Sequence, residues 1–137
     1  MTRMMTLTLV AALALPGAAQ AFRADNFLEV NPIPGGDFEV VSRPGSGAQD
    51  FWCAAGDYAR SQLGVAANRR IYIAEGRSPS LTRPGYTAVQ FTLTPPEEAL
   101  DRTSRPITLD IEDVGDSLRA ASASQYCYDR FEERLFP

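Results

Sequence analysis

The chain has 137 residues and a formal net charge of −4, from 17 acidic residues and 13 basic residues that are all arginine. This mild acidity argues against nucleic acid as a partner, since proteins that bind nucleic acid carry basic patches. The chain contains no histidine, which excludes histidine metal ligands, imidazole general bases and the usual serine hydrolase triads within the chain.

Residues 1–21, MTRMMTLTLVAALALPGAAQA, have the three parts of a secretory signal peptide. Arg3 supplies the charged start, an apolar run follows from Leu7 to Leu15, and small residues at 19–21 form the end. The run is too short for a membrane span, which needs about twenty apolar residues. We therefore expect cleavage before Phe22, one domain over residues 22–137, and a periplasmic or secreted location without a membrane span.

A hairpin and a helix are predicted in the first half of the mature chain. Residues 26–30 and 37–42 are short apolar segments that flank a Pro/Gly-rich turn, which is typical of two paired strands. A helix is predicted over residues 48–64, with Asp50 as its cap and Gly64 at its end. Its apolar arc includes Trp52, the single tryptophan, which we interpret as a core residue and not as part of a ligand groove.

The centre of the chain is predicted to contain two strands separated by a long loop. Residues 69–75 and 86–94 have strand patterns, and the loop between them runs from Gly76 to Gly85. Thr94 and Glu97 match a capping box, so residues 95–102 are predicted to form a short helical turn.

The last part of the chain is predicted to form a strand and a helix. Residues 106–114 alternate Ile107, Leu109 and Ile111 with polar residues, the pattern of a half-buried strand. After it, Gly115 permits a turn and Asp116 or Ser117 caps a final helix that contains Cys127.

Residues 115–118 spell Gly-Asp-Ser-Leu, which resembles the nucleophile block of the GDSL esterases. Those enzymes use a serine just after their first strand and supply Asp and His from a block near the C-terminus. Ser117 lies late in a chain without histidine, so we interpret it as a helix cap and not as a nucleophile.

Cys53 and Cys127 are predicted to form one disulfide, because two cysteines in an exported chain of this size usually pair. Closing so long a loop stabilises a domain by about 4 kcal/mol. Small residues in CAAG (53–56) and AASAS (120–124) would let the two helices approach closely enough for the bridge. The alternative is a reactive thiol, since a cysteine in the first turn of a helix has a lowered pKa.

Four stretches resemble small exported bacterial proteins of uncharacterised function: FWCAAGDYARSQLG (51–64), RIYI (70–73), FTLTPP (91–96) and YC (126–127). The resemblance covers most of the mature chain, and its distinctive parts carry the cysteines. It implies a disulfide-bonded domain and carries no activity, so it assigns no catalytic residue.

The order of these elements predicts an α+β domain, in which a small antiparallel sheet has two main helices packed on one face and one disulfide joins the chain. Arginines cluster in the middle of the chain and are the candidate ligand-binding residues: Arg69, Arg70, Arg77 and Arg83. Together they would bind an anionic group, and the long loop between the central strands is the place where function is expected. The alternative is that the loop is merely mobile and that its arginines are solvated.

We expect a monomer that binds a protein or a small anionic ligand at the cell envelope and that is not an enzyme. One alternative is a small enzyme of unrecognised type that uses Ser78 or Ser80 with a nearby arginine or carboxylate, and another is a structural accessory protein. No metal or cofactor is predicted, because the acidic stretch 110–116 lacks an oxygen ligand at the fifth position of an EF-hand loop.

Overall fold

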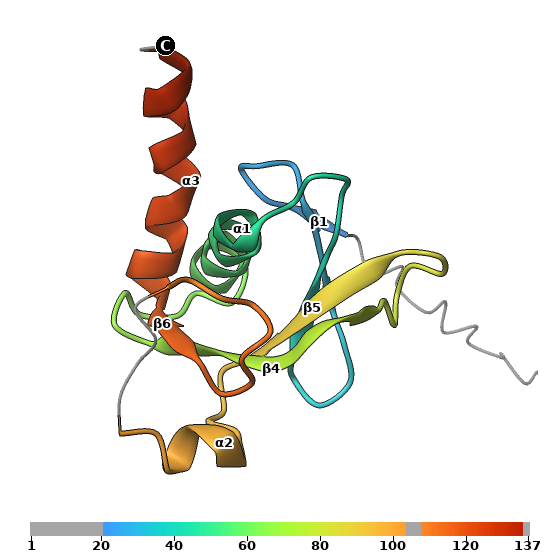
Figure 1. The fold of residues 1–137 in the computed structure, drawn as a ribbon, viewed down its shortest axis with the longest axis vertical. Coiled ribbons are helices and arrows are strands. Elements are labelled where there is room, and N and C mark those ends of the chain that lie inside the picture. The colour runs from blue at the N-terminus through green and yellow to red at the C-terminus, as the bar shows by residue number, and fades with distance from the viewer. Residues whose placement is uncertain (1–20, 104–107, 136–137) are drawn as a thin grey trace, which may run out of the picture.

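The computed structural model describes residues 21–103 and 108–135, with side chains described as far as Asp129. Six strands form one sheet in the order β1-β2-β3-β5-β4-β6, and every neighbouring pair is antiparallel (Figure 1). The elements in chain order are β1 (Phe22–Arg23), β2 (Glu29–Pro32), β3 (Phe38–Val41), α1 (Ala48–Ser61), β4 (Arg70–Pro79), β5 (Thr87–Thr92), α2 (Glu97–Leu100), β6 (Ser117–Arg119) and α3 (Ala120–Leu135). The predicted α+β class is confirmed, whereas the proposed signal peptide lies outside the described residues, apart from Ala21.

The predicted hairpin is present as β2 and β3. Val30 lies opposite Val40 in its register, and both side chains are fully buried. Gly35 and Gly36 form the turn with φ angles of 91° and 84°, a region that glycine adopts without steric cost. The sequence did not predict β1, whose two residues pair with β2 at the edge of the sheet.

Helix α1 lies against one face of the sheet and supplies most of the aromatic core (Figure 1). Trp52 is completely buried, with its ring centroid 5.1 Å from that of Phe91 in an edge-on arrangement, and its indole N–H donates to the carbonyl of Asp110 at 3.1 Å. The prediction that Trp52 is a core residue is therefore confirmed. The helix begins at Ala48, the first residue of the predicted range, but the predicted cap is wrong: Gly47 is the N-cap, and Asp50 accepts its N–H at 2.8 Å from the third helical position.

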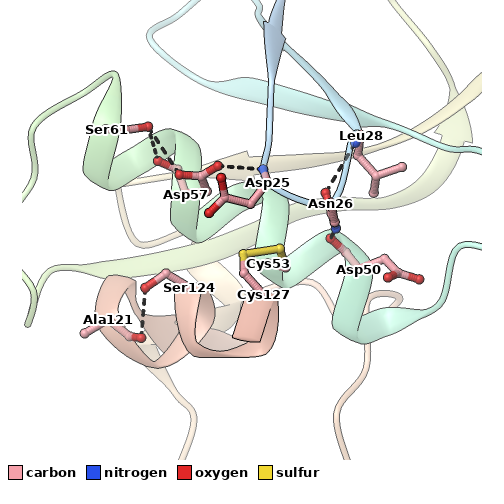
Figure 2. The surroundings of a disulfide bond; sticks show 10 residues. All are labelled: Asp25, Asn26, Leu28, Asp50, Cys53, Asp57, Ser61, Ala121, Ser124 and Cys127. Atoms are coloured by element: carbon pink, nitrogen blue, oxygen red, sulfur yellow. Dashed lines mark hydrogen bonds between the residues drawn. A yellow bond between two sulfur atoms is a disulfide. The ribbon is translucent and has the colours of Figure 1, made fainter. Parts of the chain in front are cut away.

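Helix α3 packs against α1, and its C-terminal part extends away from the sheet (Figure 1). The predicted disulfide joins the two helices, with Cα atoms of Cys53 and Cys127 4.8 Å apart and both residues buried (Figure 2). Gly56 makes this approach possible, since a Cβ there would lie 2.8 Å from the Cβ of Ala123. The small residues around the cysteines have the role that the sequence predicted.

Residues 108–116 contain no strand, which corrects the strand predicted over 106–114; Pro106 and Ile107 lie outside the described residues. Leu109 and Ile111 do pack in or against the core, as their alternation indicated. The backbone takes another path because the Asp110 carboxylate accepts the N–H groups of Ile111 and Glu112, which bends the chain.

The cap predicted at Asp116 or Ser117 is also wrong. Gly115 does make a turn, with φ 89°, but Ser117 belongs to β6 and α3 begins only at Ala120. The first N–H groups of α3 are bound by backbone carbonyls: Ala120 donates to Arg69 and Ala121 to Ala67. No side-chain cap is needed where the chain itself supplies the acceptors.

The loop predicted from Gly76 to Gly85 is shorter in the structure, because β4 continues to Pro79 and pairs with β5 around two register shifts. The outer edge of this extension is covered by Glu112, whose carboxylate accepts the N–H of Arg77 at 3.2 Å. Gly76 leaves room for it: a Cβ there would lie 3.1 Å from the Cα of Glu112. Helix α2 forms where the helical turn was predicted, but Pro96 and not Thr94 is its N-cap.

Loss of the disulfide should lower the free energy of unfolding by about 2–5 kcal/mol, because the unfolded chain regains the entropy of an open loop. Reduction of the wild type and Cys127→Ala should both show this loss in urea or thermal unfolding, and Ser122→Ala on the exposed side of α3 is the control. Alkylation of both cysteines in the folded protein without reductant would contradict the bridge.

Gly56→Ala should destabilise the protein by about 1–3 kcal/mol, because the added methyl group has to push α3 away from α1. Helix propensity alone predicts the opposite sign, since alanine is the better helix former by about 1 kcal/mol. Gly47→Ala is the control, whose Cβ would make an ordinary contact, 3.9 Å from Asp50. A melting temperature that is unchanged or raised in Gly56→Ala would refute the tight contact.

Candidate functional site

The four arginines predicted to bind an anion do not gather in one place. Arg83 lies in the hairpin between β4 and β5, where its guanidinium is 2.6 Å from the carboxylate of Glu29 and stands over the ring of Tyr86 at 5.0 Å. This arginine already has an anionic partner and an aromatic neighbour in the fold.

Arg77 lies within β4 and contacts the start of α1. Its guanidinium stands 5.2 Å from the ring centre of Phe51 and donates to the carbonyl of Ser46 at 3.1 Å. It lies seven positions after Arg70 on the same strand, a distance on the order of 20 Å. Arg77 and Arg70 therefore cannot hold one small ligand between them.

Arg69 and Arg70 remain together at the first end of β4. Arg69 donates to the carbonyl of Leu93 at 3.2 Å, and Arg70 donates to the hydroxyl of Ser117 at 3.0 Å. Arg70 also faces Arg119 directly across the β4–β6 ladder, and both are exposed. Like charges directly opposite each other on two strands are unfavourable, and the ion pairs among the described residues, Arg83–Glu29 and Arg102–Asp113, include neither of them.

A polar pocket with a volume of about 290 Å³ opens beside this arginine pair, between β4, β6 and the segment that follows α2. We call it the arginine pocket. The residues of its wall that matter for chemistry are Arg70, Tyr72, Arg102, Gly115, Asp116 and Ser117.

Arg102 closes one side of the arginine pocket. Its guanidinium makes a two-pronged contact with the Asp113 carboxylate, at 2.8 and 2.9 Å, and donates to the carbonyl of Val114 at 3.1 Å. This hydrogen bonding holds the pKa of the Asp113 carboxyl below its ordinary value. The Nε of Arg102 is buried and has no hydrogen-bond partner among the described residues.

Gly115 sets how closely α2 approaches the pocket. A Cβ on Gly115 would lie 2.9 Å from the backbone nitrogen of Ala99, so only glycine fits between the turn and the helix. The same turn buries the neighbouring Asp116, which is 1 % exposed and accepts the N–H of Ser117 at 2.8 Å. The Gly-Asp-Ser sequence thus shapes a pocket wall.

Sequence reasoning did not name the pocket residues Arg102 and Asp116 as candidate site residues, nor Arg119, which pairs with Arg70 beside the pocket. Arg119 was assigned to a helix, which hid its register against Arg70, and Arg102 and Asp116 come to the pocket only through tertiary packing. The available signal was the unusual turn sequence around Gly115, which was interpreted as a cap.

The hairpin where function was expected is instead organised around a buried carboxylate. Glu39 in β3 is 0 % exposed and accepts hydrogen bonds from Ser80, Leu81 and Thr82. Burial raises the pKa of this carboxyl, but these hydrogen bonds outweigh burial and bring the pKa below its ordinary value of 4.5. A carboxylate with a lowered pKa is a poor base, so the arrangement favours a structural clamp over a Ser80 nucleophile.

A second hollow, of about 330 Å³, lies beside the disulfide where the β1–β2 turn meets α1 and α3. Figure 2 shows the Asp57 side chain next to the backbone of Asp25, whose N–H donates to it at 2.9 Å. Burial raises the pKa of the Asp57 carboxyl, and the negative charge of Asp25 acts in the same direction. Within residues 21–103 and 108–135, no group of three or more His, Cys, Asp or Glu is placed to hold a metal ion.

The fold and the site together define a small disulfide-bonded α+β domain with a polar, arginine-bearing pocket. Comparisons with protein-family models, with curated proteins and with solved structures find no match for the chain. No helix in the described part of the chain is long and apolar enough to cross a membrane.

Glu39→Gln should lower the free energy of unfolding by about 1–3 kcal/mol at neutral pH, because the charged, buried acceptor of several hydrogen bonds is lost. The folded-state pKa of Glu39 is lowered, so its contribution is present above the unfolded-state pKa and disappears as the pH falls through the folded-state value. The stability difference between wild type and variant should therefore shrink on acidification. Glu75→Gln, at an exposed position of β4, is the control; a difference that does not change with pH would contradict the clamp.

Proposed function

We propose that the protein is an exported, non-enzymatic domain that binds an anionic group at the cell envelope, on a small ligand or on the surface of a partner protein. The observation that carries this proposal is the Arg70–Arg119 pair, two exposed arginines directly opposite each other in the β4–β6 ladder, of which Arg70 lines a polar pocket. An anion between them would replace their repulsion by two charge-assisted hydrogen-bonding contacts.

Export is supported by two independent features. The sequence of residues 1–21 has the composition of a secretory signal, and the Cys53–Cys127 disulfide is compatible with an oxidising compartment outside the cytoplasm.

Because Arg70 and Arg119 are exposed, salt should screen their interaction with an anion.

An affinity pull-down from extracts of the exporting cell tests this function, with bound proteins and small molecules identified by mass spectrometry. Wild-type protein should recover a partner at low salt and less of it at high salt, and Arg70→Ala/Arg119→Ala should recover much less at either salt concentration. Arg77→Ala/Arg83→Ala removes the same charge from the β4–β5 hairpin and should keep the partner. Equal recovery by wild type and Arg70→Ala/Arg119→Ala, at equal melting temperatures, would exclude the arginine pair.

A further inference from the structure

The arginine pocket presents hydrogen-bond donors from several directions. Arg70 uses one of its five N–H groups on the Ser117 hydroxyl. Because the oxygen of Ser117 is the acceptor in that bond, its own hydrogen can be donated to a ligand. The buried Nε–H of Arg102 has no partner among the described residues, and Arg119 lies directly opposite the pocket residue Arg70 in the β4–β6 ladder. Donors from separate side chains suit a tetrahedral oxyanion better than a planar carboxylate, which has only two oxygens.

The side chains at and beside the pocket also carry a small net positive charge, which favours an anion. Arg70, Arg102 and Arg119 carry three positive charges, against two negative charges on Asp113 and Asp116. Helix α3 begins at Ala120, directly after Arg119, so the positive end of its dipole lies at the same place. Its first two N–H groups are already bound by backbone carbonyls, so the helix contributes potential and not hydrogen bonds.

Asp116 is the unusual member of such a site, because its buried carboxylate repels an anion. A carboxylate accepts up to about four hydrogen bonds, so Asp116 can keep its present contacts and still accept one from a ligand. Inorganic phosphate at neutral pH carries a P–O–H group and can donate that bond. Sulfate carries no proton at this pH, and the phosphodiester of a lipid headgroup has no P–O–H either, so both would meet Asp116 with repulsion alone.

We propose that the arginine pocket binds inorganic phosphate, with Arg70, Arg119 and Ser117 as donors and Asp116 as the acceptor that selects phosphate over sulfate. This inference rests on the proposed function and names the chemistry of the small ligand. It makes Asp116 a specificity residue, which accepts a hydrogen bond that phosphate can donate and sulfate cannot.

Titration of the wild-type protein with phosphate, and separately with sulfate, tests the inference at neutral pH and constant ionic strength. Backbone amide NMR shifts should saturate with phosphate at residues of β4, β6 and the 113–116 turn, and sulfate should bind at least about tenfold more weakly. Dimethyl phosphate and phosphatidylglycerol vesicles, which offer a diester without P–O–H, should not compete. These two arms separate free phosphate from a lipid headgroup and need no variant.

Single substitutions test the role of each side chain in phosphate binding. Arg70→Ala and Arg119→Ala should each weaken phosphate binding about tenfold, the usual cost of one lost charged hydrogen bond, whereas Arg60→Ala, an exposed arginine on α1, should leave it unchanged. Asp116→Asn keeps an oxygen for the Ser117 N–H and removes the charge. In that variant sulfate should bind as tightly as phosphate.

Equal binding of phosphate and sulfate by the wild type would overturn the inference, as would phosphate-induced shifts that never saturate. It would also be overturned if Arg60→Ala lost as much phosphate affinity as Arg70→Ala. A failure of this kind leaves the proposed function separately measurable. If the pull-down still depends on Arg70 and Arg119 while phosphate does not bind, the anionic group belongs to another ligand. If neither experiment depends on the two arginines, both proposals fail.

Discussion

The close contact between α1 and α3 is the constraint on which the rest of the structure depends. The Cys53–Cys127 bridge closes it, and the missing side chain of Gly56 allows the two backbones to meet. The position of α3 then fixes β6, because no residue separates Arg119 from Ala120 and because Ala120 is bound to the carbonyl of Arg69. Placing β6 beside β4 brings Arg119 opposite Arg70 and Ser117 opposite Tyr72. The covalent bond between two helices thus holds the wall of a pocket on the sheet.

Those parts of the fold that follow from local patterns could be predicted from the sequence. The β2–β3 hairpin has alternating apolar residues and a glycine turn, and the disulfide follows from two cysteines flanked by small residues. Prediction failed where side chains redirect the backbone. The Asp110 carboxylate bends a segment whose alternation is that of a strand, and the Glu39 carboxylate binds residues 80–82 of what reads as a long open loop. Neither effect is visible in periodicity, because each depends on one polar side chain and its partners.

The candidate site was predictable only in part, for a related reason. Arg70 stood out in a locally basic stretch, but Arg77 in the same stretch packs over the ring of Phe51, and Arg83 forms an ion pair with Glu29. The residues that join Arg70 come from the second half of the chain, and their arrival depends on the register of β6. Ser117 drew attention through a resemblance to a nucleophile block, and it does lie in the pocket, as a hydroxyl that accepts from Arg70. The arginine-rich composition could indicate that anions are bound, but only the tertiary structure says which of the described arginines form ion pairs.

The contact of Gly76 with Glu112 has a consequence for the behaviour of the chain in crowded surroundings. β6 pairs only with the first residues of β4, which leaves the later part of that strand with an outward-facing edge. Such an edge is a template on which another polypeptide can add a strand, the first step toward aggregation or domain exchange. Glu112 occupies one of its N–H groups and places a negative charge there, and only a residue without a side chain at position 76 leaves space for it. One glycine and one glutamate thereby discourage self-association at an edge that the sheet topology leaves open.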